Sequence, residues 1–324
     1  MVSSVNRRKL LKAAGVAGIT AIAGCLGGDG DGGDGDGGDS SQLSWHAGGQ
    51  SGTYYPLSNE FKSIVDENTD YSLQVQSTGA SVANVGSLGR EEADFALIQN
   101  DVGYFAANGT GLEEFEGEPV ENLRGVATLY PETIHIVTQA DSGISSIQDL
   151  EGTTINTGDL GSGTQVNALQ ILESVGITTD DFEEQNSGFS SASDQIKDGD
   201  IDAAFVVGGW PVGAIEDLAT TSDISLVEVP EDVREDIKSD AEWFADDTIP
   251  GGQYGGIDED VETVSVQAMI ATHTGVDETV VEEVTAAIFD NVDELSTKAD
   301  FISVDSAQEG MSIELHAGAD AYFN

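Results

Sequence analysis

Two periods of apolar residues alternate along residues 43–324. Short apolar runs such as 93–98 and 201–207 are typical of buried strands, and between them apolar residues recur every three or four positions, as in helices. The segment 278–295 shows the helical pattern most clearly. Because strands and helices alternate, the chain is predicted to fold as an α/β protein.

The strands 93–98 and 201–207 share a further feature. Each follows a turn that carries acidic residues, and each ends in small or polar residues. Two lobes with a similar order of strands and helices are the simplest explanation. We expect the chain to leave the first lobe along a strand over 134–139 and to return along one over 263–272, so that two crossings form a hinge. The predicted boundaries are 43–138 and 264–324 for the first lobe and 139–263 for the second.

Glycines and hydroxyl groups gather where the predicted strands end. The segment 159–165 contains two glycines and two hydroxyl side chains between a short strand and a helix. The first N–H groups of such a helix, together with its dipole, favour an anion. A strand-to-helix turn also needs a cap and glycines for its own sake, so this segment alone does not separate a ligand site from a structural turn.

The other strand ends add to that motif. The segments 48–56 and 77–81, after the first two strands, are rich in Ser, Thr and Gly, and residues 99–101 after the third carry two amides and an acid. In an open parallel sheet these ends lie at one edge, where ligands bind. The sequence therefore predicts one binding site built from loops that are far apart in the chain.

Residues 1–24 are predicted to be an export signal. Arg7 and Arg8 begin a basic stretch, and the apolar stretch 13–24 is shorter than the roughly 20 residues of a membrane-spanning helix. The arginine pair is typical of the twin-arginine route. Cys25 follows small residues, as in a lipoprotein processing site, and we expect it to carry a lipid that anchors the protein to the outer face of the cell membrane. A buried free thiol is the alternative.

Residues 25–42 contain that cysteine and a run of glycine and aspartate, and they are predicted to form a flexible tether. The aspartates resemble a calcium loop only superficially, because the closing glutamate and the flanking helices are missing. No metal site is expected. Since the chain has one cysteine, the mature protein has no internal disulfide.

The charge of the protein is strongly negative. Its 11 basic and 60 acidic residues give −49, and loss of the signal, which holds four basic residues and no acid, leaves −53. Such a protein repels nucleic acid and anionic lipid surfaces. Acids in excess over few lysines are typical of proteins that work in concentrated salt, where the screening length is about 3 Å at 1 M. We interpret the acidity as a halophilic adaptation of the whole surface.

We expect the folded protein to lose its structure on dialysis into low salt, because the repulsion among its acids is then unscreened. Circular dichroism and the melting temperature, followed from molar to millimolar salt, measure the effect. An unchanged melting temperature would contradict the halophilic interpretation.

The mature chain contains, in this order, the segments Gly52–Pro56, Gly79–Asn84, Ala93–Gln99, Leu129–Glu132 with His135–Val137, Gly161–Thr164, Asp202–Phe205 and Leu315–Ala319. Through these segments, and over nearly all of the mature chain, the sequence resembles the TAXI-type solute receptors of tripartite ATP-independent periplasmic (TRAP) transporters. The resemblance implies a two-lobed, periplasmic-binding-protein-like fold of type II with a small organic solute in the cleft between the lobes. It also implies delivery of that solute to the membrane subunits of a TRAP transporter driven by an ion gradient, with no cofactor.

The resemblance further implies which residues contact the solute. They are Thr53, Tyr54, Ser81, Gln99, Asp101, Ser162, Gly163, Thr164, Gln165, Gly209, Trp210 and Pro211. Their hydroxyl groups can donate to a carboxylate, so a dicarboxylate or an amino acid is the expected solute. Tyr54 is either a wall of the site or a packing contact, and Trp210 either closes the cleft or packs. Gln165 stands where many relatives are expected to have an acid, and no arginine falls in a predicted turn.

An enzyme is the alternative from another class. The four histidines are scattered without zinc-ligand spacing, and the chain has neither a Gly-x-Ser-x-Gly elbow nor a phosphate loop. Asp198, Asp200 and Asp202 could suggest a cation, but a helix-to-strand turn accounts for them. We therefore expect no catalytic residues, and an exported hydrolase or other enzyme on the same two-lobed scaffold remains the alternative. An adhesion protein would need repeats, which the sequence lacks.

Overall fold

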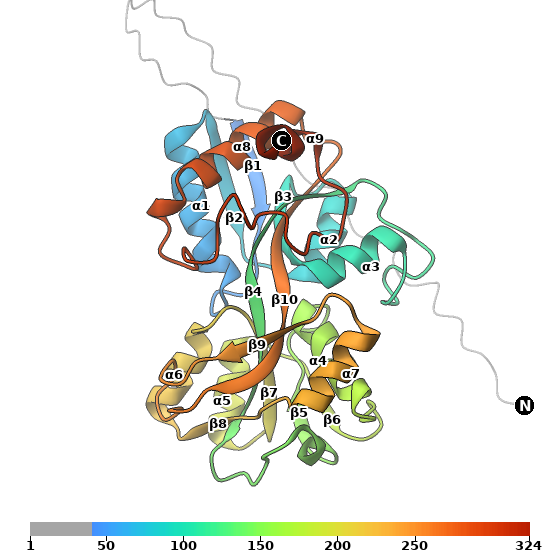
Figure 1. The fold of residues 1–324 in the computed structure, drawn as a ribbon, viewed down its shortest axis with the longest axis vertical. Helices are drawn as coiled ribbons and strands as arrows, with labels where there is room; N and C mark the ends of the chain where they lie inside the picture. Colours follow the sequence, from blue (N-terminus) through green and yellow to red (C-terminus); the bar gives the residue numbers. More distant parts are fainter. Residues whose placement is uncertain (1–40) are drawn as a thin grey trace, which may run out of the picture. The chain divides into compact units, whose positions relative to one another are not determined.

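The computed structural model of the protein describes residues 41–324 (Figure 1). The predicted export signal, Cys25 and the tether up to residue 40 lie outside the described residues. Within residues 41–324, no helix combines the length and the apolar character needed to cross a bilayer.

The first lobe is a sheet with helices on both faces. Its strands follow the order β2-β1-β3-β10-β4, with β1, β2 and β3 parallel and β10 antiparallel to β3. Its elements are β1 (Ser41–His46), α1 (Tyr54–Asn68), β2 (Tyr71–Gln76), α2 (Ser81–Gly89), β3 (Phe95–Gln99), α3 (Asn100–Asn108), α8 (Glu278–Asp290), a 3-10 turn (Val292–Glu294) and α9 (Ala317–Phe323).

The continuous apolar pattern of β3 follows from this layering. Phe95 and Leu97 pack into the core under α1 and α8, whereas Ala96 and Ile98 pack into the core under α2 and α3. All five residues of β3 are buried, as a central strand covered on both faces requires.

The second lobe repeats the arrangement with the strand order β4-β7-β5-β6. In β7 (Ala203–Val207), Phe205 packs into one core, and Ala204 and Val206 pack into the other. The remaining elements are a 3-10 turn (Ile147–Leu150), β5 (Thr154–Asn156), α4 (Gly163–Ser174), β6 (Glu183–Gln185), α5 (Phe189–Asp198), α6 (Gly213–Thr221), β8 (Ile224–Leu226), α7 (Glu231–Asp240) and β9 (Ala245–Ile249).

Two long strands, β4 (Leu123–Gln139) and β10 (Val261–His273), run through both lobes (Figure 1). β4 pairs with β10 up to Thr133 and with β7 from Ile134 onwards. The strand predicted over 134–139 is thus the second half of β4. Pro131 does not end β4, because it lies beside a shift in the register between β4 and β10, and such irregularities tolerate proline. The predicted two-lobed α/β fold is confirmed.

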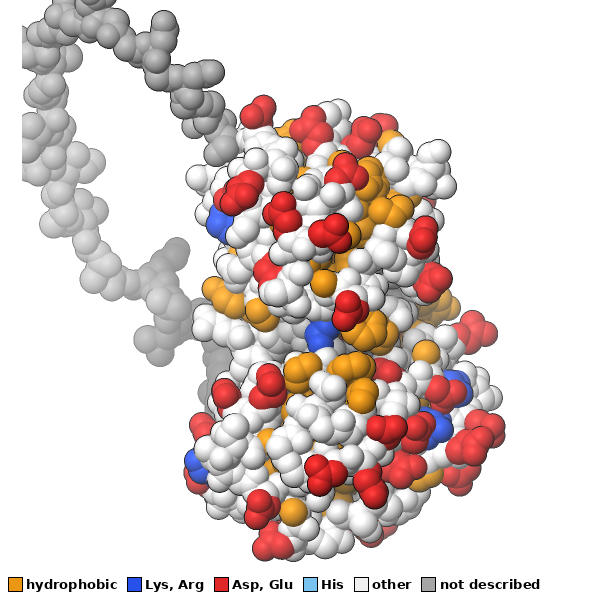
Figure 2. Space-filling model, turned by 60° about the vertical axis from the view of Figure 1, so that its left-hand side comes forward, with side chains coloured by type: hydrophobic (Ala, Val, Ile, Leu, Met, Phe, Trp, Pro, Cys, Tyr) orange, Lys and Arg blue, Asp and Glu red, His pale blue; other side chains and the backbone are white. Residues whose placement is uncertain are grey.

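Acidic side chains are spread over the visible face of both lobes (Figure 2). Most have no basic partner, because only seven lysines and arginines follow the predicted signal. Some of the few ion pairs cluster around β9, where Arg234 and Lys238 of α7 contact Asp246. The charge is therefore a property of the whole visible surface and not of one patch.

Candidate functional site

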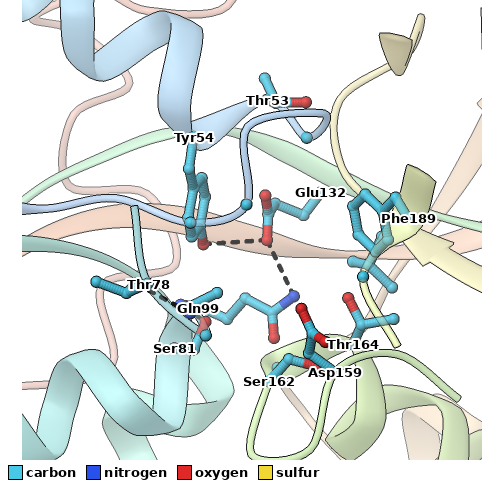
Figure 3. A pocket seen from close by; sticks show the side chains of 18 of the residues that line it. Thr53, Tyr54, Thr78, Ser81, Gln99, Glu132, Asp159, Ser162, Thr164 and Phe189 are labelled. Carbon is cyan, nitrogen blue, oxygen red and sulfur yellow. Dashed lines mark hydrogen bonds between the residues drawn. The ribbon is translucent and has the colours of Figure 1, made fainter. Parts of the chain in front are cut away.

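A cavity lies between the two lobes, where the strand ends meet (Figure 3). Its volume is about 80 Å³. The first lobe lines it with the turns after β1 and β2, the end of β3 and one residue of β4. The second lobe contributes the turns after β5 and β6 and the end of β7. The lining residues that carry the argument below are Thr53, Tyr54, Ser81, Gln99, Glu132, Asp159, Ser162, Gly163, Thr164 and Phe189.

The turns of the first lobe are held together by Asn84 of α2. Its side-chain amide donates to the carbonyls of Ala47 at 2.6 Å and Leu97 at 2.7 Å, and its oxygen accepts from Thr78 at 2.7 Å. Ser81 Oγ in turn accepts from the backbone N–H of Gln99 at 3.1 Å. These bonds tie the ends of β1, β2 and β3 to one another, so this wall of the cavity is formed before any solute arrives.

The N-terminus of α4 forms the opposite wall. Ser162 caps the helix, because its Oγ accepts from the N–H of Gln165 at 3.2 Å. Gly163 and Thr164 follow in the first turn, where N–H groups have no acceptor within the helix. Their N–H groups, the Thr164 hydroxyl and the helix dipole together favour an anionic group of a solute.

Glu132 of β4 is an acid at the floor of the cavity. Its Oε2 accepts from Tyr54 Oη at 3.1 Å and from Gln99 Nε2 at 2.9 Å (Figure 3). Its Oε1 accepts from Tyr130 Oη at 3.1 Å. The side chain is only 4% exposed. Burial raises the pKa of Glu132 to about 7, although the three donors lower it. Near neutral pH this carboxyl is therefore poised between its two protonation states.

The remaining lining is acidic or neutral. Asp159 of the second lobe is the other ionisable acid, and Tyr54 and Phe189 are the aromatic side chains. No lysine, arginine or histidine lines the cavity within the described part of the chain. The same part of the chain contains no group of three His, Cys, Asp or Glu side chains that could hold a metal ion. The arrangement can pair a cation with Glu132 or Asp159 and an anion with the start of α4.

Seven of the predicted contact residues line this cavity, from both lobes. They are Thr53, Tyr54, Ser81, Gln99, Ser162, Gly163 and Thr164. Tyr54 both packs in the core of the first lobe and aims its hydroxyl at Glu132, so the two interpretations of its role are compatible.

The other predicted contacts lie elsewhere. Asp101 is buried behind the lining and accepts from Asn167. Gln165 is turned away, because it accepts from the N–H of Gly161 at 2.9 Å and donates to Glu184 at 3.0 Å. Gly209 and Trp210 border a separate small hollow with Lys298 and Phe301, and Pro211 lines neither hollow. Trp210 packs edge-on against Phe301 there, and its carbonyl accepts from Lys298.

Sequence reasoning missed Glu132, Asp159 and Phe189. Glu132 had a usable signal, since it is the only acid in the long and mainly buried strand β4. Asp159 opened the glycine-rich segment but was not assigned a contact. Phe189 begins α5 and carries no pattern that distinguishes it from a core residue.

Known proteins resemble the chain in sequence pattern and in fold. Residues 46–324 match the sequence model of a family described as NMT1-like family. The alkanesulfonate-binding protein SsuA from Xanthomonas axonopodis pv. citri, bound to MOPS, is 13% identical with a TM-score of 0.48, over 80% of this chain and 78% of that one. A putative L-cystine ABC transporter from Listeria monocytogenes is 13% identical with a TM-score of 0.48, over 82% and 98%. An ancestral arginine-binding protein bound to arginine is 14% identical with a TM-score of 0.48, over 81% and 96%.

Proposed function

The chain belongs to the NMT1-like family, and from this premise we propose that it is a solute-binding receptor that captures a small organic molecule between its lobes. The observation that carries the proposal is the cavity lined by loops of both lobes, which β4 and β10 join as continuous strands. A cavity between two bodies joined by a few strands opens and closes without disturbing either core.

We further propose that the receptor works outside the cytoplasm and passes its solute to a TRAP transporter. The support is the resemblance to TAXI-type receptors, carried by the strand-end motifs, together with the twin-arginine signal and the lipid anchor expected at Cys25. In this proposal the membrane subunits of the transporter and the lipid bilayer are its partners.

The chemistry of the cavity favours an amino acid over a dicarboxylate. The start of α4 suits one carboxylate, but a second carboxylate on the side of the first lobe would face Glu132. Two like charges 4 Å apart repel by about 4 kcal/mol at an effective dielectric constant of about 20. An ammonium group at the same place is attracted instead. We propose that the solute is a zwitterion whose ammonium group pairs with Glu132 and whose carboxylate binds at Ser162 to Thr164.

A panel of amino acids, dicarboxylates, keto acids and sugars, screened by melting temperature in molar salt, tests the proposal. At a hundredfold excess over Kd a ligand stabilises the folded state by about 2.7 kcal/mol. We expect stabilisation by one or more amino acids without turnover. Turnover of a panel compound, or no stabilisation by any class, would contradict the proposed function.

Replacing Ser162 and Thr164 together by alanine is expected to weaken binding by about 1–3 kcal/mol, since one or two buried hydrogen bonds to the solute are lost. Calorimetric titration with the stabilising amino acid measures the loss. Because Ser162 also caps α4, the control is Ser146→Ala, which removes the Ser146 cap of the 3-10 turn Ile147–Leu150 in the same lobe. The control should lower stability and leave affinity unchanged. Full affinity in the double variant would rule out the anion site at α4.

A further inference from the structure

Asp101 and Asn167 join the two lobes directly. Asp101 lies in the first turn of α3 in the first lobe, and Asn167 lies in the second turn of α4 in the second lobe. Asn167 Nδ2 donates to Asp101 Oδ2 at 2.7 Å, and both side chains are completely buried. Separation of the lobes must break this bond and admit water to the carboxylate.

Each member of the pair has a side-chain oxygen without a donor. Asp101 Oδ1 and Asn167 Oδ1 are both buried and accept no hydrogen bond from any described residue. Buried acceptors are almost always satisfied, so two orphans on one bonded pair need an explanation. A proton on Asp101 Oδ1 supplies one. A carboxylic acid and a primary amide can exchange two hydrogen bonds, with Asn167 Nδ2 donating to Oδ2 and the acid O–H donating to Asn167 Oδ1.

The surroundings of Asp101 also favour the protonated form. Burial raises the pKa of Asp101 to about 7, against the opposing effects of Asn167 and of the nearby backbone N–H groups of Asp101 and Val102. The charge of Asp101 in turn raises the pKa of Glu132 of β4. The residues that pack against α3 from its neighbours carry no ionisable group: Val82 and Val85 of α2, Ile98 of β3, Met269 and Gln267 of β10, and Ser312 and Ile313 of the C-terminal segment.

We propose that Asp101 and Asn167 form a proton-dependent latch, in which closing of the lobes takes up one proton on Asp101 and opening releases it to solvent. Asp101 is thus a positioning residue that sets the balance between open and closed receptor. The inference rests on the proposed opening and closing of the lobes and holds for any solute.

The sign of the pH effect follows from the two states. In the open state water reaches the carboxylate, and its pKa falls toward the ordinary 3.8, whereas in the closed state it is about 7. The latch therefore strengthens closure fully at pH values below the open-state pKa, and this contribution is lost as the pH rises through 7. Within that window the ratio of closed to open receptor changes by up to about tenfold per pH unit.

The distance between spin labels on the two lobes tests the latch in the full chain without solute. The labels are attached at Ser63→Cys on α1 and Thr220→Cys on α6, which are both exposed positions. The protein's own cysteine is removed by Cys25→Ser. In molar salt, acidification from about pH 8.5 to about pH 5.5 should raise the ratio of closed to open receptor at least about tenfold. In Asp101→Asn, whose amide can make both bonds without a proton, the ratio should be high at both pH values.

Glu132 titrates in the same range, so the comparison is repeated in the Glu132→Gln background, where Asp101→Asn should still abolish the pH dependence.

A second measurement is the unfolding midpoint across the same pH range. The midpoint should fall as the pH rises through 7 in the Glu132→Gln protein, and it should change less with pH when Asp101→Asn is added. Asn167→Ala should lower the closed population at both pH values, because neither hydrogen bond of the pair can then form. If Asp101→Asn leaves both the distances and the pH profile of the midpoint as they are in its parent, the latch is refuted.

Discussion

Gly163→Ala is expected to weaken solute binding roughly 10- to 100-fold and to leave both lobes folded. Gly163 is the first residue of α4 and has an ordinary backbone conformation, so alanine is no worse for the helix itself. A methyl group at this position, however, would overlap the side-chain amide of Gln99 and come within 2.9 Å of Ser81 Oγ, both in the other lobe. Gly163 is therefore required for the close approach of the lobes.

The size of the effect follows from what Gln99 must give up. If Gln99 moves aside, it loses its hydrogen bond to Glu132, and bonds to charged groups contribute about 1.5–3 kcal/mol. If it stays, the lobes cannot close on the solute. Either way, calorimetric titration with the stabilising amino acid should show a lower affinity at an unchanged melting temperature of the free protein.

Gly213→Ala is the matched control. Gly213 is also the first residue of a helix of the second lobe, but the nearest atom to an added methyl group is a backbone oxygen at 3.8 Å. This variant should bind as the parent does. Gln99→Ala removes the atoms that the methyl group would overlap most closely and leaves only Ser81 Oγ at 2.9 Å, so adding Gly163→Ala to that variant should cost much less than in the parent. An equal cost in both backgrounds would show that the overlap is not the cause.

Glu132→Gln is expected to weaken binding of the stabilising amino acid by about 30-fold or more, because removing one partner of a buried charge pair costs roughly 2–5 kcal/mol. Glutamine keeps the size of the side chain, and its oxygen can still accept from Tyr54 or Tyr130. Dicarboxylates should gain affinity in the same variant, since their second carboxylate no longer meets a negative charge. This opposite response of the two solute classes separates loss of charge from general damage.

The pH dependence of binding also tests whether Glu132 pairs with an ammonium group of the solute. With a pKa of about 7, Glu132 is ionised above that pH, and ammonium binding through it should weaken as the pH falls through 7. Glu132→Gln should remove this component. Asp247→Asn is the control, because it removes one negative charge from a partly buried carboxylate that accepts from Thr133 outside the cavity. Equal losses in Glu132→Gln and Asp247→Asn, or no loss in Glu132→Gln, would refute the ammonium site.

The sequence by itself determined the layered fold and the places where loops converge. The apolar runs of β3 and β7 are continuous because both faces of each strand are covered, and this pattern can be recognised without knowing the partners. The hydroxyls and glycines after β1, β2 and β5 indicated the lining because parallel strands end at one edge of a sheet. These features depend on neighbours within a few residues, which the sequence contains.

Only the tertiary structure decided what each side chain near the site does. Glu132 faces the cavity, and burial by distant segments raises its pKa, while its donors Tyr54 and Gln99 lie 78 and 33 residues away in the chain. Asp101, next to Gln99 in the predicted cluster, is instead drawn toward Asn167 of the other lobe. Burial, charge environment and side-chain direction arise from contacts between distant segments, and no local pattern of residues carries that information.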